Sequence, residues 1–596
     1  MEPQQIVLDQ TEYKTIILGT GLLESLLSTA LAYKGFPSVN LDKDISYSSA
    51  MKTCSLKEFK QVFTELLPSQ SNKSFKIINY QDDMTEEESK NKSRGFNIDL
   101  QPRFLYSRSQ TVDKMIEAGM DKYMDFRAIN GIYFFSEDKQ KFVLVPTNKG
   151  EIFASDEFGL IEKRNLFKLL HMCSALYTKL NQVQVDQNST AEFDKDLLLD
   201  EDEVKKIMDM RKKHFKEFLT HYKVSDKLAK MLLYIIGNYQ FSFQESETPE
   251  HFVSTEDFIN RINKFLRSAG VHSTYPYLYT NYGTSDILQG FSRSSAVFGS
   301  LFIVNKDLVL DEIVINPPKE NNINFKLKTP IAGPSEYLTS RFMVLNKDYV
   351  PLIKGLKEGQ ELEKKALLRM TFIVRSEDEN LQLDTPGMYY IFPDNKTLNN
   401  THPVFVFLTG EKTSSAPEGA YIFYVQTIVD SDTPQDVLKE YATKIRSLLD
   451  TALIKEAKVR NLVSVVYLQV RRKFAGEEEL KEKPNIVVVD DDDFLLEFDD
   501  YYKKAEDYTR HLVPENPEML FFENFEKKTK EDLEKKLEAE DEAEQETHLN
   551  ELLEKLDKLK AGKGQEKEEK EGAGDQPEES QNQAQAQGQN TENNEQ

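Results

Sequence analysis

The stretch Lys14-Thr15-Ile16-Ile17-Leu18-Gly19-Thr20-Gly21-Leu22-Leu23-Glu24 decides the fold. Its short β-branched run predicts a strand, its two glycines predict a tight turn, and apolar residues at helical spacing from Leu22 to Leu31 predict a helix. A glycine and a proline then end this helix before a second short strand at 38–42. The chain therefore opens with a βαβ unit.

The turn of this unit resembles a G-x-G-x-x-G dinucleotide fingerprint in which the third glycine is replaced. Gly19 and Gly21 occupy the first two positions, Glu24 stands at the third, and Asp42 follows at the usual ribose-binding position. A carboxylate in the first helical turn adds bulk and competes with a pyrophosphate for the free N–H groups. We therefore predict a strand-to-helix turn without a bound cofactor, and a flavin-dependent oxidoreductase is the less favoured alternative.

Beyond this unit, helical and strand patterns follow one another in blocks. Long amphipathic patterns fill residues 161–267, whereas alternating strand patterns return after Tyr282 and continue through 420–427. The fold class predicted is α/β, with a discontinuous domain of the FAD-binding type and an inserted all-helical domain. The polar stretches 81–94 and 183–203 are predicted to be surface loops.

The C-terminal region changes composition at about Phe474. Acidic runs at 477–479 and 490–493 lead into a Glu/Lys-rich stretch that ends in Gln, Asn and Glu. Such a composition buries too little apolar surface to offset its chain entropy. We predict a partly ordered acidic extension at 476–526 and a disordered charged tail at 527–596.

Composition excludes several classes of function. A formal net charge of −25 opposes nucleic-acid binding, and the apolar runs are too short to cross a bilayer. The N-terminus does not resemble a signal peptide, so a cytoplasmic location is expected. The two cysteines, Cys54 and Cys173, are expected to be reduced, buried thiols.

Catalytic and metal-binding signatures are absent from the sequence. We find no nucleophile elbow, no H-E-x-x-H motif, no Walker loop and no Cys/His spacing typical of a metal site. The sequence therefore predicts a protein without its own catalytic site and without a metal.

Several segments together resemble the family of Rab GDP-dissociation inhibitors and Rab escort proteins. They comprise Leu18 to Glu24, Asp42 to Tyr47, Phe96 to Leu100 with Arg103 to Arg108, Phe158 to Leu170, and Tyr275 to Lys306, which reads YPYLYTNYGTSDILQGFSRSSAVFGSLFIVNK. The resemblance implies a protein that binds GDP-bound Rab GTPases, before and after prenylation, through its first domain. It places the Rab contacts at Tyr47, Asp286, Arg293 and Ile303. From the residues alone, Arg293 could instead form a salt bridge with Asp286, and Tyr47 could be an ordinary exposed tyrosine.

The resemblance implies three further binding regions. A groove for the flexible Rab C-terminus falls at Val112, Met115 and Ile116, and contact with the Rab geranylgeranyltransferase α/β heterodimer falls at Val271 and Phe265. A geranylgeranyl chain would lie between helices of the second domain, with Phe167, Leu170, Phe218, Leu232, Tyr234 and Ile236 as candidates. Ordinary helix and core packing is the alternative for these side chains.

The details of the segments favour an escort type over an inhibitor type. Leu105 to Arg108 and Ala296 to Gly299 resemble the escort versions, and Val271 is apolar where inhibitors carry arginine. The resemblance then implies presentation of new Rabs to the transferase and transient membrane contact during their delivery. It divides the chain into a Rab-binding domain at 1–158 and 275–475 and a lipid- and transferase-binding helical domain at 159–274.

Overall fold

The computed structural model describes residues 8–43, 51–66, 75–92, 95–180, 201–249, 251–316, 325–356, 359–378, 381–455, 457–489 and 496–513. Tyr47, most of the expected loop at 183–203 and the whole expected tail lie outside these ranges. Over the described ranges, every helix is too short or too polar to cross a bilayer.

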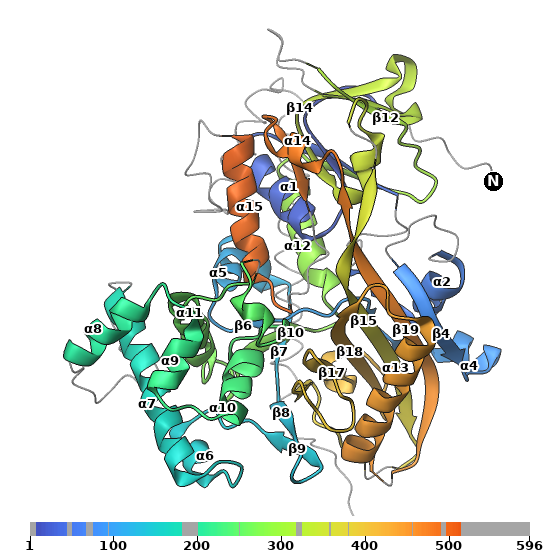
Figure 1. Cartoon of the computed structure of the whole chain (residues 1–596). Helices are drawn as coiled ribbons and strands as arrows, with labels where there is room; N and C mark the ends of the chain where they lie inside the picture. Colours follow the sequence, from blue (N-terminus) through green and yellow to red (C-terminus); the bar gives the residue numbers. More distant parts are fainter. Residues whose placement is uncertain are drawn as a thin grey trace, which may run out of the picture. The chain divides into compact units, whose positions relative to one another are not determined.

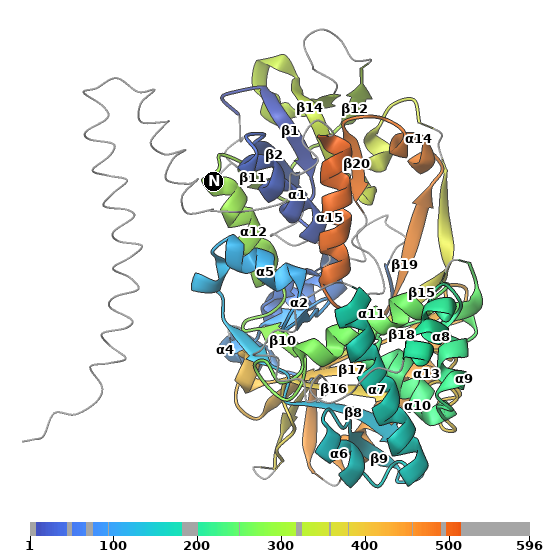
Figure 2. The same cartoon turned by 90° about the vertical axis from the view of Figure 1, so that its left-hand side faces the viewer.

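The first sheet contains the predicted βαβ unit (Figures 1 and 2). Strand β1 (Glu12–Leu18) leads through helix α1 (Leu22–Tyr33) to β2 (Ser38–Asp42), which runs parallel to β1. Next to β2 lies β11 (Leu301–Val304), which runs parallel to β2, and on the other side of β1 lies β14 (Tyr337–Asn346), which runs parallel to β1. The sheet is completed by β12 (Glu312–Ile315), β13 (Phe325–Lys328) and β20 (Ile486–Val489). Strands from distant parts of the chain share this sheet, which confirms that the α/β domain is discontinuous.

The second sheet has eight strands in the order β4-β19-β15-β18-β17-β16-β8-β9. Its strands are β4 (Phe75–Asp82), β8 (Gly131–Ser136), β9 (Lys141–Leu144), β15 (Gln360–Ser376), β16 (Gly387–Ile391), β17 (Val404–Thr409), β18 (Ala420–Asp430) and β19 (Val459–Phe474). On β17, Val404 and Val406 face helix α13 (Gln435–Leu449), whereas Phe405 and Phe407 face the core shared with the helical insert. This alternation follows from the two-residue repeat of a strand.

The helical insert follows β9 and includes α6, which lies before the predicted start of this domain at residue 159. It contains α6 (Lys149–Ala154), α7 (Leu160–Leu180), α8 (Glu201–Met210), α9 (Phe215–His221), α10 (Asp226–Lys230), a π-helical turn at Met231–Ile236 and α11 (Thr255–Ser268). Buried side chains of α7, α9 and α11 form one continuous core with the second sheet.

Smaller elements connect these parts. They include β3 (Thr53–Cys54), α2 (Leu56–Gln61), β5 (Ile98–Asp99), β6 (Leu105–Tyr106), α5 (Gln110–Glu117), β7 (Phe126–Ala128), β10 (Tyr277–Thr280) and α12 (Ser285–Val297). Cys54 and Cys173 are both free and buried, which confirms the prediction for the two thiols.

The acidic extension contributes to the core of the first domain. After α14 (Glu477–Lys481), β20 pairs parallel to β14, and α15 (Asp499–Leu512) packs Tyr501, Tyr502 and Leu512 into the cluster that holds α1. Aromatic and aliphatic residues at helical spacing therefore outweigh the acidic composition of this segment.

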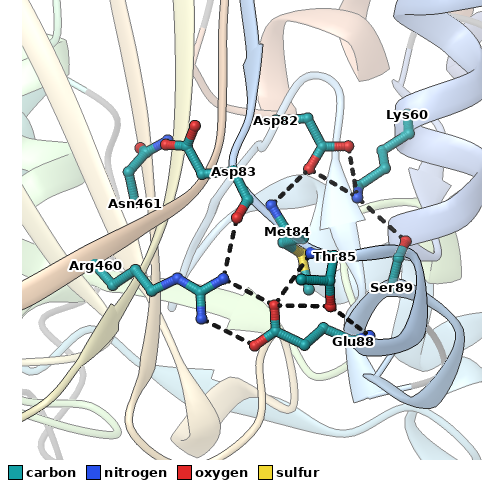
Figure 3. Close-up of polar contacts among 9 residues, drawn as sticks. All are labelled: Lys60, Asp82, Asp83, Met84, Thr85, Glu88, Ser89, Arg460 and Asn461. Carbon is teal, nitrogen blue, oxygen red and sulfur yellow. Dashed lines mark hydrogen bonds and ion pairs between the residues drawn. The ribbon is translucent and has the colours of Figure 1, made fainter.

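The prediction of a loop at 81–94 was wrong for its middle part, which forms helix α4 (Glu86–Lys92). Thr85 and Glu88 cap this helix reciprocally, since Glu88 N donates to the Thr85 hydroxyl at 3.2 Å and Thr85 N donates to the Glu88 carboxylate at 3.2 Å. Arg460 of β19 donates to the Glu88 carboxylate at 2.8 and 2.9 Å, and Lys60 of α2 forms an ion pair with Asp82. Figure 3 shows both contacts. The S/T-x-x-E capping signal was present in the sequence and identifies this helix.

Candidate functional site

The turn between β1 and α1 is closed by the side chain of Glu24. Gly19 has φ of +115°, and a Cβ placed on it would lie 2.6 Å from Glu24 Oε1. The Glu24 side chain is fully buried, and Asn346 Nδ2 donates to the same oxygen at 3.0 Å. The carboxylate thus lies where a pyrophosphate would approach the helix N-terminus.

Asp42, at the position of a ribose-binding acid, is likewise engaged within the protein. The Thr20 hydroxyl donates to one carboxylate oxygen at 2.6 Å, and the Tyr349 hydroxyl donates to the other at 3.2 Å. With Glu24 and Asp42 both used internally, the residues of this turn do not fit a dinucleotide. The described ranges also contain no cluster of three His, Cys, Asp or Glu side chains that could hold a metal ion.

Helix α12, which carries Asp286 and Arg293, is held against α1 by buried hydroxyl groups. The hydroxyls of Ser28 and Ser295 lie 2.6 Å apart, and the Thr29 hydroxyl donates to the carbonyl of Phe291 at 2.7 Å. Small side chains allow the two helices to approach closely and to satisfy these polar groups inside the core. The position of α12 relative to the first sheet is therefore fixed by direct contacts.

The N-terminus of α12 is fixed by Asp99, a fully buried carboxylate on β5. Asp99 accepts hydrogen bonds from the Thr53 hydroxyl at 2.5 Å, the Tyr279 hydroxyl at 2.5 Å, and the Thr284 N–H and hydroxyl at 3.0 and 2.6 Å. Burial raises the pKa of Asp99, and these donors oppose the shift. Gly283, with φ of +109°, leaves no room for a Cβ beside Asp99 and Thr53. Gly283 and Thr284 at this turn thus allow Asp99 to hold the start of α12.

Asp286 and Arg293 lie two turns apart on α12 and do not pair with each other. Asp286 is half-buried, and burial together with the charge of Asp99 raises the pKa of Asp286 to about 6. Arg293 is exposed, and its guanidinium lies 4.9 Å from the ring centre of Tyr123. Among the described side chains no ion pair joins Asp286 to Arg293, so the salt-bridge alternative is wrong.

Tyr123 is a component of this face that the sequence analysis missed. Its ring is partly exposed, and its hydroxyl donates to the carbonyl of Gly290 on α12 at 3.4 Å. A cation stacked on an aromatic face gains modest stability and a fixed orientation. No periodic pattern could have identified Tyr123, because it lies in an irregular segment and meets Arg293 only in the fold.

Ile303 does not share this surface, since it belongs to a different core cluster from the buried side of α12. It is on β11, is 7% exposed and packs with Leu41 and Leu308 in the core beneath the first sheet. Tyr47 lies outside the described residues. The structure therefore places Asp286 and Arg293 on one helix with Tyr123 beside them, and Ile303 on the adjoining sheet.

The residues expected to bind the Rab C-terminus lie on α5 and differ in exposure. Met115 is buried in the core that contains α1, Val112 is half-buried against it, and Ile116 is 55% exposed. Only Ile116 and part of Val112 are available to a partner in this conformation.

The residues expected to line a lipid site form the packed interior of the helical insert. Leu170, Phe218, Leu232, Tyr234 and Ile236 are buried in the core shared with the second sheet, and Phe167 is half-buried at its edge. The described conformation thus shows core packing, and a lipid would have to separate these side chains.

The expected transferase contacts lie at the end of α11. Phe265 is buried, with its ring centre 6.1 Å from that of Tyr277, whereas Val271 is half-buried in the turn that follows the helix. Phe265 therefore belongs to the core, and Val271 is the more accessible of the two.

Charged residues tie α11 to the segment that begins α15. Lys264 Nζ lies 3.2 Å from the buried Glu497, and Arg261 lies 3.0 Å from Asp500. Burial raises the pKa of Glu497 to about 7, and the nearby Lys264 opposes that shift. The acidic extension thereby links the helical insert to the first domain, a role that its composition did not predict.

Comparison with known proteins identifies the family. The family profile described as GDI, GDP dissociation inhibitor, matches residues 9–466. A "Rab GDP-dissociation inhibitor" of Saccharomyces cerevisiae is 25% identical over 426 residues, covering 71% of this chain and 81% of the relative. A "Rab proteins geranylgeranyltransferase component A" of Drosophila melanogaster is 23% identical over 453 residues, covering 74% and 79%.

The fold also resembles a solved structure of this kind. The crystal structure of Rab GDI from Plasmodium falciparum aligns with a TM-score of 0.59 at 18% identity, covering 85% of this chain and 98% of that chain. Since the family profile spans well over half of the sequence, the chain belongs to the GDP dissociation inhibitor family.

Proposed function

We propose that this protein is a Rab escort protein, which binds newly made GDP-bound Rab GTPases and presents them to Rab geranylgeranyltransferase. The observation that carries the proposal is the family match, with relatives named for Rab inhibition and for the transferase component A. The arrangement of α12 supports it, because an exposed arginine and a half-buried acid are displayed on one rigid helix.

Rab recognition is assigned to Asp286 and Arg293, with Tyr47 and Ile303 on the adjoining segments. The forked guanidinium of Arg293 suits bidentate hydrogen bonds to carboxylates or carbonyls, and Tyr123 restrains it from the side. This platform belongs to the domain formed by residues 1–158 and 275–475. On α5, the exposed Ile116 and the accessible part of Val112 then guide the Rab C-terminus, with Met115 packed in the core beneath them.

Lipid binding is assigned to the helical domain at 159–274. A geranylgeranyl chain in water is unfavourable by roughly 10 kcal/mol or more, because each buried CH₂ contributes roughly 0.8 kcal/mol. An apolar core that opens between helices can supply the required environment. We infer that Phe167, at the edge of this core, is the first contact, and that Leu170, Phe218, Leu232 and Ile236 lie deeper.

Contact with the transferase is assigned to Val271, and Phe265 supports Val271 from the core. Chemistry belongs to the transferase, and this chain contributes binding and placement as an accessory component. A poorly structured Rab tail is thereby held near the catalytic site, and the prenylated Rab is then carried through the cytoplasm to a membrane. The extension at 476–526 and the tail at 527–596 are assigned no contact with Rab.

A Rab GDP-dissociation inhibitor is the second candidate, since one relative bears that name at 25% identity. Both functions use the same Rab-binding face, and they differ in whether the transferase is a partner. Gel filtration of this protein with the α/β transferase, at micromolar concentrations, distinguishes them. A stable complex that Val271→Arg weakens supports the escort function. A wild-type protein that elutes separately from the transferase, yet extracts lipidated Rab from membranes, supports the inhibitor.

A further inference from the structure

The tip of the helical insert exposes apolar side chains on two consecutive helices. Phe153 at the end of α6 is 40% exposed, and Leu160 and Ile161 in the first turn of α7 are 67% and 76% exposed. Large aliphatic residues exposed side by side are unusual on a soluble surface and mark interaction sites. We call Phe153, Leu160 and Ile161 the apolar tip.

Direct contacts make the apolar tip one surface. Lys163 Nζ donates to the carbonyl of Phe153 at 2.9 Å, which brings the end of α6 against the start of α7. Gly159 N donates to Glu162 at 2.8 Å and closes the turn between them. The ring of Phe153 also lies 6.2 Å from that of Phe167. These contacts fix the end of α6, which carries Phe153, beside the first turns of α7, which carry Leu160 and Ile161.

Positive charge surrounds the apolar tip, although the whole protein has a net charge of −25. Arg164 and Lys168 continue the exposed face of α7, and among the described side chains neither takes part in an ion pair. Lys149 lies over the ring of Phe167 at 5.1 Å. The carbonyl of Lys223 accepts a hydrogen bond from Asn165, which brings a further lysine to α7.

Two of the neighbouring acids are paired with lysines. Glu157 lies 2.7 Å from both Lys139 and Lys227, and Asp156 lies 2.6 Å from Lys139. Glu151 and Glu162 keep their charges, because a hydrogen bond from an N–H group or a hydroxyl does not neutralise a carboxylate. Over residues 149–168, the cations Lys149, Lys163, Arg164 and Lys168 outnumber these two acids.

We propose that the apolar tip inserts into the surface of bilayers that carry anionic phospholipids. Leucine, isoleucine and phenylalanine would enter the boundary between head groups and acyl chains, while Lys149, Arg164 and Lys168 would contact lipid phosphates. Figures 1 and 2 both show α6 at the opposite end of the described structure from α1, so the tip is separate from the first sheet. The inference gives the proposed delivery of Rab a defined membrane contact.

Vesicle sedimentation of the full chain alone tests this inference without Rab or transferase. Vesicles of phosphatidylcholine are compared with vesicles that also contain phosphatidylserine. We expect binding only in the second case, weakened by salt as for any surface electrostatic attraction. Failure of this assay would leave Rab prenylation in solution unaffected, so the two proposals fail independently.

Two variants and one control separate the contributions. L160S/I161S is expected to weaken vesicle binding at least about tenfold, which corresponds to about 1.4 kcal/mol. R164E/K168E is expected to weaken it more than tenfold, since two cations that attract an anionic surface are lost and two repelling charges are added. Val437→Ser, at a comparably exposed position on α13, is expected to bind as the wild type does.

Three outcomes would overturn the inference. The wild type could fail to sediment with phosphatidylserine vesicles, or L160S/I161S could bind them as well as the wild type does. Alternatively, L160S/I161S could lose transferase binding while vesicle binding is unchanged, which would assign the tip to a protein partner.

Discussion

Removing the Asp99 carboxylate tests how the Rab-binding helix is positioned. In Asp99→Ala, the Thr53 and Tyr279 hydroxyls and the Thr284 N–H and hydroxyl lose their common acceptor. A buried hydrogen bond contributes about 1 kcal/mol, so the loss of this set predicts destabilisation by about 4 kcal/mol. Asp99→Asn keeps the shape and one acceptor oxygen, and about half of that loss is expected.

Urea unfolding measures the free energy, and titration with GDP-bound Rab measures the effect on the site. Because Thr284 immediately precedes α12, a frayed cap shifts Asp286, and we expect Rab affinity to fall in the same order: wild type, Asn, Ala. If the free energy of unfolding of Asp99→Ala lies within about 1 kcal/mol of that of the wild type, the claim that Asp99 holds the start of α12 is refuted.

Four further predictions follow, three from the structure and one, on residues 527–596, from the sequence composition. Rab affinity should rise with pH through about 6 and level off above it. The reason is that the pKa of Asp286 is raised to about 6 and only the ionised carboxylate can pair with a Rab cation. In a titration series, Asp286→Asn should flatten this profile. Tyr123→Ala and Arg293→Ala should be non-additive in Rab binding by roughly 0.5–1 kcal/mol, and Tyr123→Phe should bind normally. Deletion of residues 527–596 should leave Rab prenylation intact, and lost activity would assign the tail a function. The purified protein should show no visible flavin absorbance, since Glu24 fills the turn, and a yellow protein would contradict this.

The sequence predicted the helices and strands whose apolar residues recur with a regular period. The βαβ unit, the helical insert and four of the eight strands of the second sheet, β15 to β18, were predicted from periodic apolar patterns, and the structure contains them. The role of Glu24 was also predictable, because a charged residue replaced a glycine that the fingerprint requires. Helix α4 was missed although Thr85 and Glu88 form a recognisable capping pair.

Long-range contacts could not be predicted in the same way. Asp99 and Thr284 are far apart in sequence. Nothing in either segment indicates that the Asp99 carboxylate caps helix α12, which begins just after Thr284. Arg293 was identified through the family pattern, but its stacking on Tyr123 depends on how the irregular segment that carries Tyr123 packs against α12. The acidic extension was underestimated, since β20 and α15 gain their stability from the sheet and from α1.

The central claim is tested most directly by geranylgeranylation of a Rab in vitro by purified transferase, with and without this protein. Prenylation should depend on the added protein and should weaken with Arg293→Ala, while Val437→Ser should behave as the wild type does. Prenylation that proceeds equally well without the protein would contradict the escort function and leave the inhibitor as the function to test.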